Sequence, residues 1–369
     1  MKILQVITDL NTGGVPLHLL RLARYLTNHG ETVRVISLSP RGPVAQMLED
    51  SGIPTQACDA AGAWDWRVAE RLAATIGETQ PDVVHSLLFH ANIAARFACL
   101  LAGFDRRRLI CEIQTVEIER RWHLLVDGWT QGLCRWIVGN SPSVIEHLAC
   151  RAHIARPRLR LIRGGVDVDA IRSAEPIDRT ILGIPAGDPL LLWVGRLDPV
   201  KGLDVLVEAA TRVVRIHAAQ IAIVGEGPYC PELKRLVTDS GIAERVHLLG
   251  PRDDVARLLK AADVFVFPSR TEGLPNAVLE AMAAGLPVVT TDAPGCRDLI
   301  EHDRTGLIVP VDNSAALAAS ICRLLSDGGL GTRLARAAAE YVSRNFRLEQ
   351  CFGAYQALYH ETTSARSAS

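Results

Sequence analysis

The sequence predicts an α/β protein with doubly wound parallel sheets in two domains. Short apolar runs with strand character alternate with longer amphipathic segments along the chain, and this alternation is typical of parallel sheets covered by helices. Glycine-containing turns follow several strands, where open α/β sheets bind their ligands. The length of 369 residues exceeds one typical domain and suits two, each able to bury its own core.

Composition is that of an ordinary globular protein. The chain has 48% apolar and 22% charged residues and a formal net charge of -1, so bulk charge offers no attraction to nucleic acid. Its nine cysteines form no Cys-x-x-Cys pair, and we interpret them as reduced thiols of a cytoplasmic protein. The apolar run at residues 2–10 is too short for a signal peptide, and no stretch approaches the roughly 20 apolar residues of a transmembrane helix. Membrane contact would therefore be peripheral, at the inner face.

The first half of the chain shows the signals of one parallel sheet. A helix is predicted over 15–28, because apolar residues such as Leu19 and Leu26 lie on one face. Before it, Gly13 and Gly14 make either a plain tight turn or a turn at which a ligand approaches the backbone. Strands are predicted at residues 3–7, 33–37, 53–57, 83–85, 109–113 and 136–139.

Three features of this half are candidates for contacts with a second substrate. His90 follows the fourth strand, where it either caps the next helix or faces a ligand crevice. Glu117 follows the fifth strand, as a recognition group or a solvated loop charge. Arginines at 106–108 and 120–135, the latter interleaved with tryptophan, are either solvated stems over apolar surface or a contact with an anionic lipid-linked molecule.

A second sheet begins with a strand at 190–194 and a helix over 203–216, and Gly195, Arg196 and Lys201 lie between them. Arginine presents a fork of donors to phosphate oxygens and lysine a mobile point charge, so the pair suits a diphosphate leaving group. Only four of the 40 basic residues are lysines, which singles out Lys201. A surface ion-pair cluster is the alternative.

The segment after the strand at 264–267 carries the central motif. A helix is predicted over 277–284, and the loop before it leaves the first backbone N–H groups of that helix open to phosphate. The residues of this loop and helix start are Gly273, Leu274, Pro275 and Asn276.

Two carboxylates flank this helix start. Glu272 precedes the helix and Glu280 lies about one turn inside it. Carboxylates would repel phosphate unless they face hydroxyls, so a diphosphate with hydroxyl-rich ends, a nucleotide sugar, satisfies both demands. The alternative is that both are solvated surface charges.

The remaining signals complete the second sheet. Gly225 and Arg252 lie in the turns after two of its strands. Strands are predicted at 221–224, 246–249 and 288–290, and helices at 315–325, 334–343 and 348–359.

These motifs resemble the retaining glycosyltransferases of family 4. The string from Glu272 to Glu280 resembles their Glu-x7-Glu signature, residues 195–202 resemble Gly-Arg-Leu-x-x-x-Lys-Gly, and residues 225–228 resemble Gly-x-Gly-Pro. The resemblance implies the GT-B fold, with two Rossmann-like domains facing each other across a cleft. We therefore expect an acceptor domain over 1–164, a nucleotide-sugar domain over 165–346, and a returning helix with a loose tail over 347–369.

The resemblance also implies retaining, metal-independent transfer from a nucleotide-diphosphate sugar, UDP-linked in preference to GDP or ADP. The acceptor would be a glycan, a lipid-linked molecule or a small molecule, and no cofactor is expected. The catalytic candidates it implies are Glu272, Arg196, Lys201 and His90. The donor-binding candidates are Gly13, Gly14, Gly195, Gly225, Arg252, Gly273, Leu274, Pro275, Asn276 and Glu280. The acceptor-side candidates are Asp9 and Glu117.

The chain departs from the family pattern at two positions. Leu87 stands where a second histidine often follows His85 by two residues, and Glu117 stands where relatives commonly carry a histidine. Asp167 and Asp169 imitate the Asp-x-Asp metal site of the other large glycosyltransferase fold, but they lie in a glycine hinge, and we reject that interpretation.

Two other functions remain as alternatives on the same fold. A nucleotide-sugar 2-epimerase would consume donor without any acceptor. A non-catalytic sugar-nucleotide-binding partner of another transferase would bind donor and never turn it over.

Overall fold

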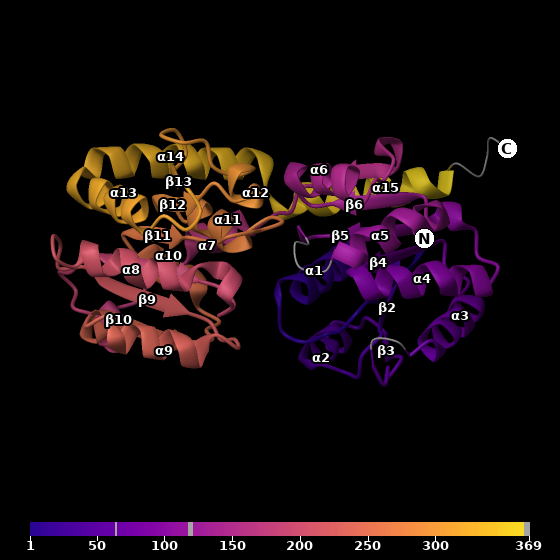
Figure 1. The fold of residues 1–369 in the computed structure, drawn as a ribbon. Coiled ribbons are helices and arrows are strands. Elements are labelled where there is room, and N and C mark those ends of the chain that lie inside the picture. The colour runs from indigo at the N-terminus through magenta and orange to yellow at the C-terminus, as the bar shows by residue number, and fades with distance from the viewer. Residues whose placement is uncertain (63–64, 117–120, 365–369) are drawn as a thin grey trace. The chain divides into compact units, whose positions relative to one another are not determined.

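The computed structural model describes residues 1–369 except 63–64, 117–120 and 365–369. The chain forms two compact units, of which unit 1 comprises Met1–Arg163 with Cys351–Ser369 and unit 2 comprises Gly164–Gln350. Each unit contains a parallel sheet and its own helices (Figure 1). The predicted α/β class with two parallel-sheet domains is confirmed.

The sheet of unit 1, as far as the structure describes it, has seven parallel strands in the order β3-β2-β1-β4-β5-β6-β7. Its central strands β1 and β4 are buried on both faces apart from Lys2, as parallel strands covered by helices are, and most of their residues are apolar. The strands are β1 (Lys2–Ile7), β2 (Thr32–Ser37), β3 (Thr55–Ala57), β4 (Val83–Leu87), β5 (Leu109–Ile113), β6 (Trp136–Gly139) and β7 (Leu159–Leu161).

Helices cover this sheet with the periodicity that the sequence predicts. In α1 the residues Leu19, Leu22 and Leu26 are all buried, at i, i+3 and i+7. The helices of unit 1 are α1 (Gly14–Asn28), α2 (Pro43–Glu49), α3 (Arg67–Thr79), α4 (Phe89–Leu101), α5 (Arg121–Thr130), α6 (Pro142–Arg151) and α15 (Leu348–Ser364).

The C-terminal helix α15 is fixed to unit 1 by buried polar contacts, and Figure 1 shows it in yellow beside the strands of that unit. The Tyr355 hydroxyl donates to Glu112 Oε1 at 2.7 Å, and the Tyr359 hydroxyl lies 2.8 Å from His85 Nδ1. His85 Nε2 lies 3.0 Å from Glu112 Oε2, and both side chains are fully buried. Burial would raise the pKa of Glu112, but contacts with His85 and Tyr355 hold this pKa below its ordinary value.

Unit 2 contains the second sheet, in which the described residues form six parallel strands in the order β10-β9-β8-β11-β12-β13. The strands are β8 (Leu190–Val194), β9 (Gln220–Val224), β10 (Val246–Gly250), β11 (Val264–Phe267), β12 (Val288–Thr291) and β13 (Leu307–Val309). The helices are α7 (Val168–Ser173), α8 (Leu203–Val213), α9 (Cys230–Asp239), α10 (Val255–Ala261), α11 (Asn276–Ala283), α12 (Pro294–Arg297), α13 (Ser314–Ser326) and α14 (Gly328–Asn345).

One predicted helix is shorter in the structure. The helix expected over 203–216 ends at Val213, because Val213 is the last buried residue of its apolar face and Ile216 is 70% exposed. Without a core to cover, the chain leaves the helix through turns that lead into β9.

The strand order of each sheet reverses between its two central strands, β1 and β4 in unit 1 and β8 and β11 in unit 2. In open parallel sheets, ligands bind at this reversal, outside the carboxyl ends of the strands. We therefore expect ligand contacts in the loops that follow β1, β4, β8 and β11.

Two further predictions can be compared with the fold. All nine cysteines are free thiols, as predicted. Within the described residues, no helix combines the length and apolar character needed to span a bilayer.

Candidate active site

An ion pair lies where the sheet of unit 2 reverses. Lys201 lies in the loop after β8 and Glu272 in the loop after β11, and Lys201 Nζ lies 2.7 Å from Glu272 Oε1. The same carboxylate oxygen accepts a hydrogen bond of 2.7 Å from the buried Ser269 hydroxyl. The Lys201 and Glu272 side chains are 20% and 10% exposed, so this charge pair is largely shielded from water. The structure thus brings together two of the predicted catalytic residues.

Arg270 connects the two loops, although no motif in the sequence indicates it. Its guanidinium makes a bidentate contact with Asp204 at the start of α8, at 3.0 and 2.7 Å, and its backbone N–H donates to Val200 O at 2.8 Å. Partial burial raises the pKa of Asp204, but the hydrogen bonds and charge of Arg270 outweigh it and leave this pKa below its ordinary value. Ser269 and Arg270 directly follow the buried strand β11, which is the signal that could have identified them.

Arg196 is placed differently from Lys201. Its side chain is 68% exposed and its Nη2 lies 2.7 Å from Asp198 Oδ2, within the same loop after β8. Between Lys201 and α8, Gly202 has φ +66°, and a Cβ there would lie 2.0 Å from Pro268 O. The fold requires glycine at this position, because only glycine lets the loops after β8 and β11 approach so closely.

The helix α11 begins directly after the Glu272 loop. Pro275 occupies its N-cap position, and a proline side chain offers no acceptor to the first N–H groups of the helix. Those groups and the positive end of the helix dipole favour an anion at this place. Glu280 lies in the second turn of α11 and is half-buried.

The buried Cys296 thiol interacts with the Glu272 carboxylate. Burial and the Glu272 charge raise the pKa of the Cys296 thiol to about 12. This shift disfavours the thiolate, which is the nucleophilic form of cysteine.

Backbone hydrogen bonds connect the carboxyl ends of β8, β9 and β10. Gly195 N donates to Val224 O at 3.0 Å, and Gly225 N donates to Gly250 O at 2.8 Å. Gly225 has φ +131°, and a Cβ on it would lie 1.8 Å from Gly195 O. Arg252 lies just after β10 and makes a bidentate pair with Asp254, in which its Nε and Nη2 atoms each donate at 2.7 Å.

In unit 1, the loop after β1 contains three of the candidates. Asp9 accepts a hydrogen bond of 3.0 Å from Asn11 N, and Gly13 and Gly14 form the start of α1. The backbone of Gly13 is extended, and a Cβ there would make only ordinary contact with Pro16. The fold itself therefore does not require glycine at this position.

His90 lies in the loop and helix that follow β4. Its ring packs edge-on against Phe89 and His123, with centroids 5.3 and 5.7 Å apart. Two residues earlier, Leu88 has φ +75°, which costs a non-glycine residue about 1–3 kcal/mol. Glu112 O accepts from Leu88 N at 3.2 Å and helps to hold this conformation. Glu117 lies outside the described residues.

The two aspartates of the rejected metal motif have other partners. Asp167 caps α7 by accepting from Ala170 N at 2.9 Å, and Asp169 pairs with Arg347. Among the described residues, no group of three or more His, Cys, Asp or Glu side chains is arranged to hold a metal ion.

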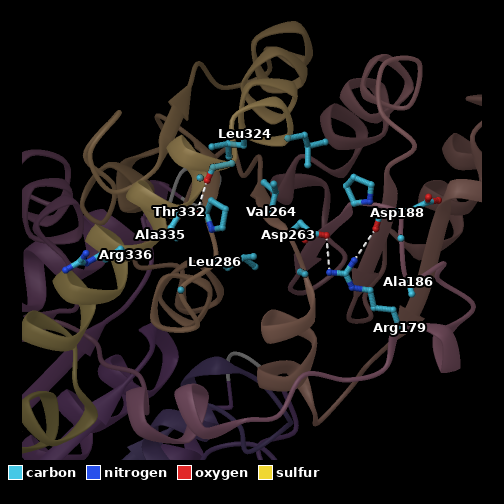
Figure 2. Close-up of a pocket in the computed structure, with 18 residues that line it drawn as sticks. Arg179, Ala186, Asp188, Asp263, Val264, Leu286, Leu324, Thr332, Ala335 and Arg336 are labelled. Carbon is cyan, nitrogen blue, oxygen red and sulfur yellow. Dashed lines mark hydrogen bonds and ion pairs between the residues drawn. The ribbon is translucent and has the colours of Figure 1, made fainter.

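A cavity of about 740 Å³ lies elsewhere in unit 2 (Figure 2). It is lined by residues that precede β8, β11 and β12, such as Pro189, Asp263 and Pro287, so it lies at the amino ends of the strands. Figure 2 shows Arg179 reaching Asp263 Oδ2 at 3.0 Å and Asp188 O at 3.1 Å. This cavity is at the opposite end of the sheet from Lys201 and Glu272 and is not part of their site.

Comparison with known proteins gives a consistent assignment. A family model described as "Glycosyl transferases group 1" matches residues 188–327, and one described as "Glycosyltransferase Family 4" matches residues 12–170. The chain is 35% identical over 219 residues to the lipopolysaccharide core biosynthesis glycosyltransferase LpsE of Rhizobium meliloti, which covers 59% of this chain and 62% of that protein. The match therefore spans less than two thirds of that relative.

A second relative is matched over more of its length. The chain is 27% identical over 307 residues to the UDP-Gal:alpha-D-GlcNAc-diphosphoundecaprenol alpha-1,3-galactosyltransferase of Escherichia coli, covering 78% of each. The fold of this chain is similar to that of HepE from Anabaena, which was solved in complex with UDP-glucose. The TM-score is 0.86 at 23% identity, over 99% of this chain and 100% of HepE. The likeness to HepE concerns the fold, and it confirms the GT-B prediction. The chain belongs to the group 1 glycosyltransferases of family 4.

Proposed function

We propose that this chain transfers a sugar from a nucleoside-diphosphate donor to an acceptor hydroxyl with retention of anomeric configuration. The observation that carries the proposal is the shielded Lys201–Glu272 pair at the point where the sheet of unit 2 reverses. Beside it, α11 begins after a proline whose side chain offers no acceptor to the first N–H groups of the helix. A cation, a carboxylate and an anion-binding helix start in one place suit a ligand that joins a diphosphate to a sugar.

Each group has a role in this proposal. Lys201 and Arg196 neutralise charge that grows on the departing diphosphate, and the N–H groups at the start of α11 hold its oxygens. Lys201 Nζ donates to Glu272 Oε1, and the same oxygen accepts from the Ser269 hydroxyl. When donor binds, Glu272 fixes hydroxyls of the sugar and Glu280 takes the ribose diol.

The transfer then proceeds on one face of the sugar. The acceptor oxygen forms a bond to the anomeric carbon as the bond from that carbon to the diphosphate oxygen breaks. The acceptor proton passes to the departing phosphate oxygen, so no separate general base is needed. In this scheme His90, Asp9 and Glu117 act on the acceptor side, in binding and orientation.

UDP is the nucleotide we propose for the donor. The Escherichia coli relative, matched over most of both chains, is named for UDP-Gal. The loops around Gly225 and Arg252 would surround the base, and they offer it main-chain groups because Arg252 is already paired with Asp254. Calorimetry with UDP, GDP and ADP tests this choice directly, and tighter binding of GDP would overturn it.

The experiment that tests the reaction is NMR of the linkage made from an α-linked donor. An α product supports the same-face route. A β product, lost on neutralising Asp9, His90 or Glu117, would show an inverting mechanism with a general base. Donor consumed without acceptor would indicate epimerisation, and donor bound but never turned over across a broad acceptor panel would indicate a binding protein.

A further inference from the structure

Exposed apolar side chains gather on two neighbouring helices of unit 1. Among the residues that the structure describes, eleven large apolar side chains are exposed, and six of these lie on α4 and α5. Trp129 is 83% exposed and Leu101 is 64% exposed. We call the six together the α4–α5 patch, which consists of Phe97, Leu100, Leu101, Trp122, Leu125 and Trp129.

The patch is presented on a rigid support. Arg96 of α4 is fully buried and donates to Asp127 Oδ1 at 2.8 Å and to Thr130 Oγ1 at 2.6 Å, both on α5. At the other end of the helices, the Phe89 ring stacks on His123 with centroids 3.7 Å apart. Because these contacts fix the two helices to each other, the exposed side chains occupy fixed positions.

Helical spacing explains why these side chains form stripes. On α5 the exposed residues stand at i, i+3 and i+7, and on α4 Phe97 and Leu101 stand at i and i+4, so each set lies on one face of its helix. Apolar residues with this spacing usually form the face with which a helix packs against the protein core. In this chain those faces are turned to the solvent.

Arginines stand at the end of the patch. A short 3-10 helix, η1 (Arg106–Arg108), follows α4, and Arg106 and Arg107 are exposed there. The Arg106 Nη1 donates at 3.2 Å to Gly132 O, in the segment that follows α5. Arg107 pairs with Asp105 at 3.2 Å, and Arg106 places a cationic side chain between the carboxyl ends of α4 and α5.

This combination of groups matches the chemistry of an anionic bilayer surface. Tryptophan prefers the boundary between headgroups and acyl chains, leucine and phenylalanine enter the apolar layer, and arginine attracts anionic headgroups. A protein partner would account for the apolar stripe, but it would not require the arginine that lies at the carboxyl ends of both helices. Charge complementarity therefore favours the anionic bilayer.

The position of the helices connects this surface to the site. The helix α4 begins at Phe89, just after β4, with His90 in its first turn, and α5 follows β5 along the chain. Both helices thus start from the carboxyl edge of the unit 1 sheet, where we place acceptor contacts. A surface held against the α4–α5 patch would lie along the helices that lead away from these loops.

We propose that the α4–α5 patch docks this protein on an anionic membrane surface and that its acceptor is lipid-linked. The acceptor part of this inference rests on the proposed glycosyltransferase function. The docking part is a property of unit 1 and can be tested without turnover.

The test is binding to vesicles by the full chain. Sedimentation with vesicles of phosphatidylcholine, with and without phosphatidylglycerol, should show binding that needs the anionic lipid and weakens with salt. Trp129→Glu and Leu101→Glu should each lower the bound fraction at least tenfold, and Arg106→Ala should reduce the preference for phosphatidylglycerol. Ile216→Glu is the matched control, since Ile216 is 70% exposed in unit 2, and it should bind as the parent does.

Tryptophan fluorescence gives an independent readout of the docked face. Brominated lipids should quench the emission of the parent protein, and Trp129→Phe should lose a share of that quenching. Vesicle binding that is equal in the parent, Trp129→Glu and Ile216→Glu would overturn the assignment of the surface. A dimer that forms without vesicles and that Trp129→Glu dissociates would show an interface between copies of this chain, and would overturn it as well.

The two proposals fail in distinguishable ways. UDP binding measured by calorimetry should be unchanged in Trp129→Glu, because Trp129 is not part of the donor site. Loss of vesicle binding with intact UDP binding in the parent would remove the docking proposal alone. Vesicle binding without UDP binding in the parent would remove the proposed function alone. Equal turnover of a soluble and a vesicle-bound form of the same acceptor would contradict the lipid-linked acceptor.

Discussion

Removing the charge of Lys201 should separate catalysis from folding. Glu272 Oε1 has two contacts, with Lys201 Nζ and with the Ser269 hydroxyl. In Lys201→Met only the contact with Ser269 remains. Truncating one partner of a buried pair costs about 3–5 kcal/mol, and an exposed pair is worth about 0.2–1 kcal/mol. With side chains 20% and 10% exposed, this pair lies between the two cases, and we expect a loss of about 1–3 kcal/mol in the stability of unit 2.

The double variant Lys201→Met/Glu272→Gln should restore most of this stability. Neutralising the carboxylate removes the uncompensated charge, so the free energy of unfolding should return to within about 1 kcal/mol of the parent. Turnover should not recover, because a preorganised contact to the diphosphate is worth about 10²–10³ in rate. The melting temperature should therefore rise from the single to the double variant, by about 2–4 °C for each kcal/mol regained.

The measurements are thermal melting and steady-state release of the nucleotide, on the parent, both variants and Lys260→Met. Lys260 lies exposed on α10 and controls for the loss of a lysine elsewhere in unit 2. Near-normal turnover in folded Lys201→Met would refute the catalytic role. Recovery of both stability and turnover in the double variant would show that the pair serves the fold alone.

Three other predictions concern pH, backbone and metal. Because the pKa of Glu112 is lowered in the folded protein, its contribution is present at neutral pH and is lost as pH falls through that pKa; the urea midpoint should drop in acid, and Glu112→Gln should flatten the drop. Gly202→Ala should destabilise the protein and reduce turnover, whereas Gly30→Ala, also at positive φ but with no atom within 4 Å of its Cβ, should cost far less; equal losses would contradict the steric argument. Turnover should be unchanged by a chelator, and activity restored by manganese after chelation would return attention to Asp167 and Asp169.

The central strands were predictable because their apolar runs are continuous. The run Leu190–Val194 is long enough to be distinguished from a loop, and the structure has a strand with the same bounds. The edge strands β7 and β13, of three residues each, were not predicted. In β7 the sequence Leu-Arg-Leu includes a half-buried arginine and an exposed leucine, so its pattern carries little apolar signal.

The charged loops of unit 2 were easier to interpret than the polar interior of unit 1. Arg196, Lys201 and Glu272 lie in short loops directly after strands, so position in the sequence indicates position at the sheet edge. The sequence did not indicate the buried cluster of His85, Glu112 and Tyr355, because Tyr355 is 243 residues from Glu112. Contacts of that sequence separation depend on which helix returns to which sheet, and spacing along the chain does not encode it.

Periodicity reveals which residues of a helix share a face, but it does not reveal what covers that face. On α1 the residues Leu19, Leu22 and Leu26 are spaced as Trp122, Leu125 and Trp129 are on α5, with intervals of three and four. The first set is fully buried under the sheet of unit 1, and the second is 41–83% exposed. The spacing alone would assign both sets to a core, although the arginines around the second set also allow an interpretation as a lipid contact. The difference arises because α5 already meets α4 through its opposite side, where Asp127 receives the buried Arg96. The structure shows that this face of α5 stays exposed after the helix has packed, and the face belongs to the surface that we propose meets the membrane.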